Sequence, residues 1–185
     1  MGTIKTTNIE PIADNGTVTL GSSGDQFTLA TGAKSSFLYP AFEAERPQSA
    51  QVVSDNTNTK VQFSIENFDT DNCYDNSTNY RFTPTVAGKY FVYARIMTRA
   101  ETNTELIVGE VSIYKNGTKI GSSRSDNGGT SKVNNKTPVI NQIVDMNGSS
   151  DYIECFGLVD VGSGNAQIYN DSAERTIFGA YRIGD

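Results

Sequence analysis

The stretch GKYFVYARIM (residues 88–97) constrains the fold more than any other, because large apolar side chains fall on both alternating sides of it without interruption. In an extended chain one side carries Tyr90, Val92, Ala94 and Ile96, and the other carries Phe91, Tyr93, Arg95 and Met97. A two-residue period of aromatic and β-branched residues predicts a β-strand. In a monomer the outer face of such a strand would be mostly polar. Because Phe91 and Tyr93 occupy that face here, we expect another surface to cover them.

Short runs of β-forming residues recur through the rest of the chain, separated by Gly, Pro, Asn and Asp. We predict strands at residues 36–44, 60–65, 80–83, 88–97, 106–114, 118–123, 139–146, 151–159 and 178–183. The dipeptide Asn116-Gly117 predicts a tight hairpin between its flanking strands. No window shows helical periodicity. The chain is therefore predicted to be an all-β, antiparallel sandwich of about ten strands, with exposed loops at residues 45–58, 99–105 and 122–137.

The N-terminal segment differs from the rest in its scarcity of aromatic residues. Its two alternating runs, TVTLG and DQFTLATG, are each too short to bury a face alone. In three parallel copies their apolar side chains meet on one axis, and these are Val18, Leu20, Phe27 and Leu29. We therefore expect an attachment arm or trimeric stem over residues 1–33 and the sandwich over residues 34–185. A flexible arm, or an edge hairpin on the sandwich, is the alternative.

Charge and residue content exclude several function classes. The chain has 15 Lys and Arg against 21 Asp and Glu, a net charge of −6, whereas nucleic-acid binding needs clustered basic side chains. Without histidine there is no Ser-His-Asp or Cys-His nucleophile. The glutamates are dispersed singly and tryptophan is absent, which disfavours a glycosidase. We expect neither enzyme activity nor a cofactor.

Two further expectations concern location. No stretch is long and apolar enough to cross a bilayer, so we expect no membrane insertion. The first residues lack the apolar segment of a secretory signal, from which we expect synthesis in the cytoplasm. In that compartment Cys73 and Cys155 are expected to remain reduced, with Cys155 a small buried side chain. A Cys73–Cys155 bridge is the alternative.

An ordered set of short motifs runs from about residue 41 to residue 183. The motifs are Phe68-Asp69, Tyr74-Asp75, Phe82-Thr83-Pro84, Gly88-Lys89-Tyr90, Lys115-Asn116-Gly117 and Phe178-Gly179-Ala180-Tyr181. Because these motifs occur in this order and spacing, the chain resembles the trimeric jelly-roll domain shared by the complement one-q globular head and the tumour-necrosis-factor ligands. Residues 15–33, NGTVTLGSSGDQFTLATGA, resemble the stems of bacteriophage tail fibres and other virion proteins.

The resemblance implies a ten-stranded jelly roll that forms a homotrimer, with aromatic residues of one sheet packed around the three-fold axis. A groove for a small ligand is the alternative use of these aromatic side chains. The candidate interface residues are Phe91, Tyr93, Tyr152, Phe156, Phe178 and Tyr181.

The acidic stretch DTDNCYD places Asp69, Asp71 and Asp75 close together in sequence. Some relatives of the complement one-q head carry calcium, and alternating carboxylates supply suitable oxygen ligands. The stretch lacks the Gly and the bidentate Glu of an EF-hand. Since the resemblance implies a structural turn at these motifs, we favour turn capping over a bound cation.

Together these features predict a non-enzymatic structural protein of a bacteriophage virion, a homotrimeric knob that attaches to the host surface or decorates the particle. The N-terminal arm would contact other virion proteins, and a host glycan or protein would bind the loops. The candidate recognition residues are Arg99, Arg124, Asp126, Asn127 and Lys132. A soluble lectin-like or ligand-binding trimer, or a capsid cement protein, is the alternative.

Overall fold

The computed structural model describes residues 39–101, 105–128, 133–173 and 176–184, and within these residues every regular element is a strand. The strands are β1 (Ala41–Glu45), β2 (Ala50–Val53), β3 (Thr59–Lys60), β4 (Ile65–Asp69), β5 (Tyr74–Asp75), β6 (Arg81–Phe82), β7 (Ala87–Arg95), β8 (Met97–Ala100), β9 (Leu106–Lys115), β10 (Thr118–Asp126), β11 (Asn135–Lys136), β12 (Val139–Asn147), β13 (Ile153–Val161), β14 (Ala166–Tyr169) and β15 (Ile177–Gly184). All pairings are antiparallel, which confirms the predicted all-β class.

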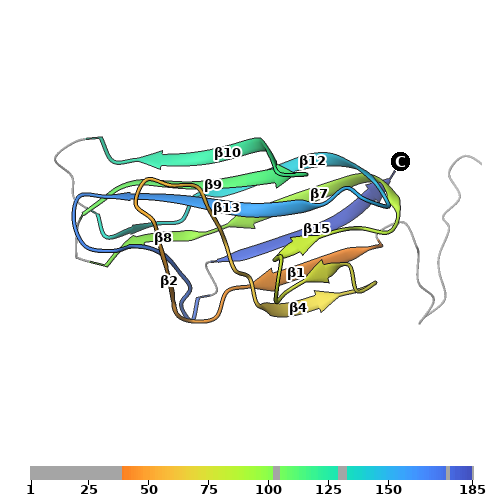
Figure 1. Ribbon diagram of the computed structural model, residues 1–185, viewed down its shortest axis with the longest axis horizontal. Helices are drawn as coiled ribbons and strands as arrows, with labels where there is room; N and C mark the ends of the chain where they lie inside the picture. Colours follow the sequence, from red (N-terminus) through yellow and green to blue (C-terminus); the bar gives the residue numbers. More distant parts are fainter. Residues whose placement is uncertain (1–38, 102–104, 129–132, 174–175, 185) are drawn as a thin grey trace, which may run out of the picture. The chain divides into compact units, whose positions relative to one another are not determined.

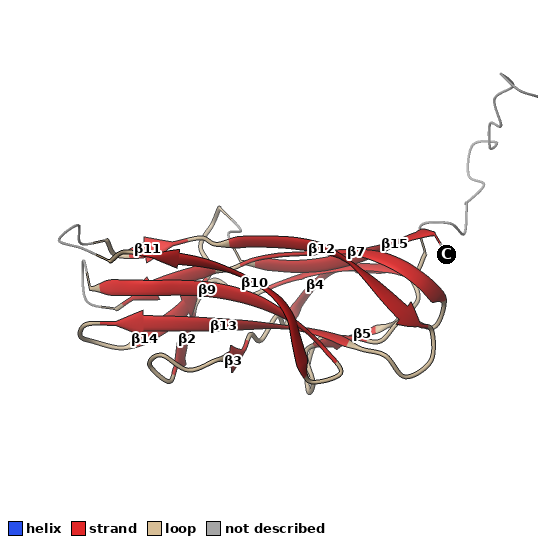
Figure 2. Ribbon diagram, turned by 90° about the horizontal axis from the view of Figure 1, so that it is seen from above, coloured by secondary structure: helices blue, strands red, loops and turns tan. Residues whose placement is uncertain are grey.

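The strands form two layers (Figures 1 and 2). Sheet I has the order β12-β7-β15-β1-β4, and sheet II has the order β10-β9-β13-β6-β5, with β3 added on β13. Sheet III has the order β11-β8-β14-β2, and these four strands correspond in order to β12, β7, β15 and β1 of sheet I. Each of its strands adjoins the matching strand of sheet I in sequence, as β8 adjoins β7 and β2 adjoins β1. Sheets I and III are therefore one layer that is interrupted across its middle.

Side-chain hydrogen bonds supplement the backbone ladder at this interruption, where the Ile96 amide still donates to the Pro138 carbonyl at 3.3 Å and the Arg46 amide to the Thr176 carbonyl at 3.2 Å. Pro138, between β11 and β12, has no N–H for a ladder. The Met97 amide donates to Thr176 Oγ1 at 2.8 Å, and that hydroxyl donates to the Tyr169 carbonyl at 2.5 Å. Asn170 Nδ2 donates to the Arg46 carbonyl at 2.6 Å. Buried backbone groups must find partners, and this chain of polar contacts supplies them.

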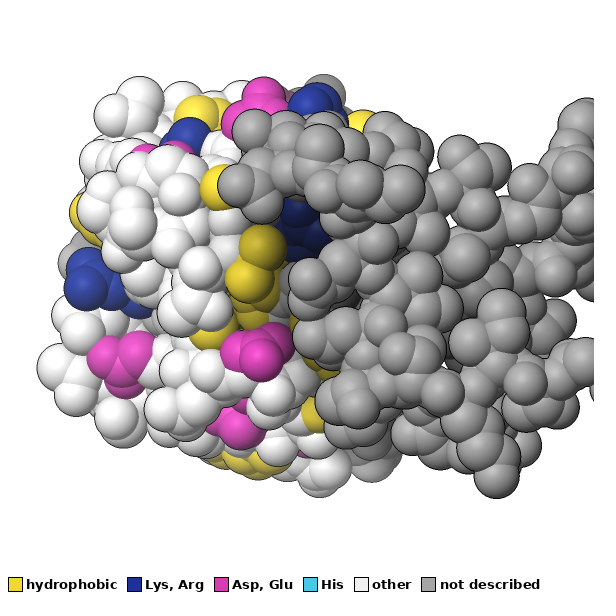
Figure 3. Space-filling view, turned by 90° about the vertical axis from the view of Figure 1, so that its right-hand side faces the viewer, with side chains coloured by type: hydrophobic (Ala, Val, Ile, Leu, Met, Phe, Trp, Pro, Cys, Tyr) yellow, Lys and Arg dark blue, Asp and Glu magenta, His cyan; other side chains and the backbone are white. Residues whose placement is uncertain are grey.

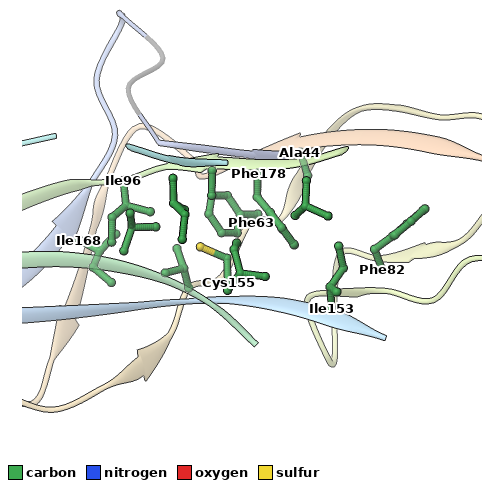
Figure 4. Close-up of a cluster of buried hydrophobic side chains, with 14 of the residues drawn as sticks. Ala44, Phe63, Phe82, Ile96, Ile153, Cys155, Ile168 and Phe178 are labelled. Atoms are coloured by element: carbon green, nitrogen blue, oxygen red, sulfur yellow. The ribbon is translucent and has the colours of Figure 1, made fainter. Parts of the chain in front are cut away.

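The core between the layers contains a cluster of aromatic rings among mainly aliphatic side chains. The Phe42 ring stacks on the rings of Tyr74 and Phe82, both at 4.5 Å between centroids, and meets Phe178 edge-on at 5.0 Å. The Cys155 sulfur lies among these apolar side chains (Figure 4). Both cysteines are unpaired and buried, so the alternative of a bridge between them is wrong.

The predicted hairpin is confirmed. Lys115 pairs with Thr118, and the two residues between them, Asn116 and Gly117, have φ angles of 51° and 77°. Positive φ at both central positions matches the right-handed twist of the flanking strands, which is why Asn-Gly is favoured there.

Several predicted boundaries are wrong. The predicted loop at residues 45–58 contains β2, and β5 and β14 form where no strand is predicted. The predicted strand at residues 60–65 is divided between two sheets. Its start belongs to β3, which pairs with β13 of sheet II, and its end belongs to β4, which pairs with β1 of sheet I. Val61 and Phe63, which lie between β3 and β4 in the chain, are fully buried. The predicted N-terminal stem, including Val18, Leu20, Phe27 and Leu29, lies outside the described residues.

Candidate self-association face

The outer face of sheet I, which points away from sheet II, carries the aromatic side chains that the sequence singles out. Strand pairing places its residues in three rows that cross β1, β15, β7 and β12 in that order. The apolar row is Ala41, Tyr181, Phe91 and Ile143; the polar row is Glu43, Gly179, Tyr93 and Asn141; the mixed row is Glu45, Ile177, Arg95 and Val139. The alternate residues of β7, among them Tyr90 and Val92, are fully buried, so the predicted division of this strand is confirmed.

The apolar row forms an aromatic cluster within a single chain. The Phe91 ring lies 5.5 Å from the Tyr181 ring and 6.2 Å from the Tyr93 ring. Phe91 and Tyr93 are half-buried, whereas Tyr181 and Ile143 are exposed, Ile143 to 62%. Neighbouring side chains of the same sheet thus cover part of this row, and Tyr181 and Ile143 remain open to a partner.

The polar row contains a side-chain bridge across β15. The Tyr93 hydroxyl donates to Glu43 Oε2 at 2.7 Å, and Asn67 Nδ2 donates to Glu43 Oε1 at 3.0 Å. The Tyr93 ring reaches β1 because Gly179 lies beneath it, and a Cβ at Gly179 would overlap that ring. Burial, followed by the hydrogen bond to Glu43, raises the pKa of Tyr93 well above its usual value, so the hydroxyl stays protonated.

An apolar pocket of about 410 Å³ opens at the β1–β4 edge of the same face. Its lining residues are Tyr39, Ala41, Phe68, Thr70 and Tyr181. Thr70 Oγ1 accepts a hydrogen bond from the Ala41 amide at 3.0 Å, which fixes the chain that follows β4 against β1. Two of the lining residues, Ala41 and Tyr181, belong to the apolar row, so the pocket is a continuation of that row.

The predicted interface residues do not form one patch. Phe91, Tyr93 and Tyr181 lie together on the outer face of sheet I. Phe178 is fully buried in the core of one chain, so its assignment to an interface is wrong.

The remaining two predicted interface residues lie on the sheet II side of the domain. Phe156, on β13, stacks on Tyr114 with 4.1 Å between ring centroids. Tyr152, just before β13, lies under the Arg81 guanidinium at 4.5 Å. They do not join the aromatic cluster of sheet I.

The outer face of sheet II is largely polar in character. Lys60 Nζ lies 2.5 Å from Glu154 Oε1, and Glu110 pairs with both Lys119 and Arg124. At the end of the domain that Figure 3 shows, the visible hydrophobic side chains form only a narrow strip beside carboxylates. Among the described residues, six exposed large hydrophobic side chains lie on strands of sheet I and two, Ile107 and Ile120, on strands of sheet II, so the broader apolar surface belongs to sheet I.

Two of the three aspartates of DTDNCYD, Asp69 and Asp75, cap turns by accepting from backbone amides. Asp69 Oδ2 accepts from the Tyr74 amide at 2.7 Å, and Asp71 Oδ2 accepts from the Thr70 hydroxyl at 2.8 Å. Asp75 accepts from the amide of Thr78 at 2.8 Å and from those of the adjacent residues, and these hydrogen bonds hold its pKa well below its usual range. Across the described ranges no group of three or more His, Cys, Asp and Glu side chains could hold a metal ion. The geometry matches the turn interpretation.

Three of the predicted recognition residues lie on strands rather than in loops. Arg99, on β8, stacks on Tyr169 at 4.8 Å, and Arg124 and Asp126 belong to β10. Asn127 follows β10 and donates from Nδ2 to the Leu106 carbonyl at 3.0 Å. Lys132 lies outside the described residues.

The members of the face that the sequence-based prediction lacks include Ile143, Gly179 and Glu43. Ile143 carried a usable signal, because VINQIVDM places Val139 and Ile143 on one side and Ile140 and Val144 on the other. For Gly179 and Glu43 no sequence signal exists, since their role depends on how Tyr93 crosses β15.

No protein-family model matches the chain, and no curated protein matches its sequence. Among solved structures, Eiger TNF from S. frugiperda matches with a TM-score of 0.53 and 10% identity, over 79% of this chain and 93% of that one. Murine APRIL at pH 8.0 matches with a TM-score of 0.53 and 10% identity, over 77% and 98%. Murine APRIL at pH 5.0 gives 0.51 and 12%, over the same shares. The fold is a tumour-necrosis-factor-like jelly roll. None of the described residues forms a helix suited to crossing a membrane.

Proposed function

We propose, taking the tumour-necrosis-factor-like jelly roll as the premise, that this chain is a non-enzymatic, homotrimeric structural protein of a bacteriophage virion. The jelly roll would form a knob that attaches to the host surface or decorates the particle. One observation carries the trimer: the outer face of sheet I exposes apolar side chains on β12, β15 and β4, with Phe91 of β7 linking the first two strands and the apolar pocket linking the last two. They are Ile65, Phe68, Val139, Ile143, Tyr181 and Ile183.

Contiguous exposed apolar surface of this kind marks an interaction site. Sheet II supports the choice of face, because its outer side holds paired charges such as Lys60–Glu154. An obligate interface buries roughly 2,000 Å² or more. If about half of that is apolar, at roughly 25 cal/mol per Å² it contributes about 25 kcal/mol before ordering costs, enough to keep subunits together.

Residues 1–33 would attach the knob to other virion proteins, in keeping with their resemblance to tail-fibre stems. Host binding would be multivalent, since three copies per knob and several knobs per particle multiply weak contacts through effective concentration. The net charge of −6 favours a neutral glycan or a protein as the host ligand over an anionic one.

A second candidate is a soluble ligand or lectin-like trimer, and the structural likeness to Eiger TNF favours it. A capsid cement protein differs from the leading proposal only in where the N-terminal segment docks.

The molar mass of the full chain in solution, measured by light scattering, tests the trimer. Three copies of the 20.0 kDa chain give about 60 kDa, and a mass near 20 kDa would refute the proposal. Mass spectrometry of purified, nuclease-treated virions should then detect the chain as a particle component. Binding to a glycan array together with absence from particles would favour the soluble ligand instead.

A further inference from the structure

We infer that the apolar pocket at the β1–β4 edge receives Ile143 from a second copy of this chain, so that subunits join head to tail. The inference rests on the proposed trimer and identifies the contact that would hold it together. The pocket is lined by three rings and a methyl group, with Thr70 as its polar member, so its chemistry suits an aliphatic side chain.

Ile143 is the natural occupant. At 62% it is the most exposed large hydrophobic side chain on the described residues. It lies on β12, at one edge of sheet I, whereas β4 forms the opposite edge. One subunit therefore presents a projecting apolar side chain at one edge and a pocket at the other.

The two features lie at the same height along the strands. Strand pairing connects Ala41 to Tyr181, Tyr181 to Phe91, and Phe91 to Ile143. In a closed ring each subunit is rotated about one axis without being shifted along it. If that axis runs along the strands, Ile143 of one copy reaches the Ala41 end of the same row in the next.

The rows on either side match as well. With Ile143 in the pocket, Asn141 of the polar row lies level with Glu43 of the next copy. Val139 of the mixed row, 55% exposed, lies level with Glu45, whose partner on β4 is the exposed Ile65. Both flanking rows of the next copy are mixed, because Glu43 is paired on β4 with Phe68 and Glu45 with Ile65, so Asn141 finds a carboxylate and Val139 finds an apolar side chain at the same level.

Direct pairing of two β12 edges is disfavoured, because β10 of sheet II lies beside β12 (Figure 1). Gln142 of β12 packs so closely on Gly121 of β10 that a Cβ at Gly121 would overlap it. A second strand adding to β12 would meet β10, whereas side-chain insertion requires no free backbone groups.

Disulfide trapping in the full chain tests the contact. Cys at position 143 (Ile143→Cys) and at position 70 (Thr70→Cys), the exposed pocket residue beside Ala41, are combined in one chain, and mild oxidation should yield covalent trimers on non-reducing gels. Neither single variant should cross-link, and the native chain, whose cysteines are buried, serves as the blank. Dimers from Ile143→Cys alone would show a two-fold contact and overturn the inference.

A charge at the same position gives an independent readout. Ile143→Lys should weaken association by about 100-fold or more, because the insertion would bury an unpaired ammonium. Ile107→Lys, at a 41% exposed residue of β9 in sheet II, is the matched control and should leave the trimer intact. A native monomer would refute the proposed function itself. A native trimer that neither cross-links nor responds to Ile143→Lys would refute the pocket contact alone.

Discussion

The Tyr93–Glu43 bridge predicts that a substitution which ordinarily stabilises a protein will destabilise this one. Gly179 is not among the residues with positive φ, so alanine suits its backbone. Gly→Ala at a compatible position stabilises by about 0.4–1 kcal/mol, because the unfolded chain loses freedom. Here the new methyl group would overlap the Tyr93 ring and lie 3.0 Å from the Phe42 carbonyl oxygen. The ring must move, and its hydrogen bond to the Glu43 carboxylate is lost.

The expected magnitude follows from these two terms. A hydrogen bond to a charged group is worth about 1.5–3 kcal/mol, so the net loss for Gly179→Ala should be about 1–2 kcal/mol. Urea unfolding at a fixed protein concentration measures it, since the proposed association would also contribute to stability.

A double-mutant cycle gives the control. Tyr93→Val removes the ring and leaves the 3.0 Å approach to the Phe42 carbonyl oxygen, so in that background Gly179→Ala should cost much less than in the native one. The difference between the two backgrounds should be about 1.5–3 kcal/mol, the worth of the lost hydrogen bond. A neutral or stabilising Gly179→Ala in the native background would refute the claim that Gly179 exists to admit the ring.

Three other predictions concern groups away from this bridge. Burial raises the pKa of Tyr90 to about 12, so the stability that its neutral form contributes is present below pH 10 and is lost as pH rises toward 12. In Tyr90→Phe the free energy of unfolding should therefore decrease less steeply with pH above 10. Hydrogen bonds lower the pKa of Asp75 below its ordinary 3.8, so its contribution is present above that pH and lost as pH falls further. Asp75→Asn should reduce the free energy of unfolding at pH 7 and make it depend less on pH in acid. An unchanged loss of stability in acid would contradict the turn-capping role. Thr176→Val should cost about 1–3 kcal/mol, because it leaves the buried Met97 amide unpaired, whereas Thr176→Ser should cost much less in the same urea titration.

Local patterns predicted those parts of the fold whose cause is local. The two sides of β7 follow from strict alternation, and the hairpin at Asn116-Gly117 follows from the φ angles that these residues tolerate. The two-residue strand β5 and the four-residue β14 carry too little pattern to be recognised, and pairing with distant strands creates them.

The error at Phe178 has a simple geometric origin. Residues 178 and 181 are three apart, so on one strand they must face opposite sides, and both cannot belong to one interface. Tyr181 points outward and Phe178 inward. The pocket was beyond sequence reasoning, because Tyr39, Phe68 and Tyr181 meet only through the pairing of β1 with β4 and β15.

If the domain holds a particle to a surface, as proposed, the interruption between sheets I and III has a mechanical consequence. The covalent chain crosses the interruption from β7 to β8 at Ile96, but few hydrogen bonds, among them those at Thr176 and Asn170, connect neighbouring strands there, whereas β9 and β13 run unbroken through the other layer. Stretching should therefore separate neighbouring strands at the interruption before it separates the long β9–β13 pair.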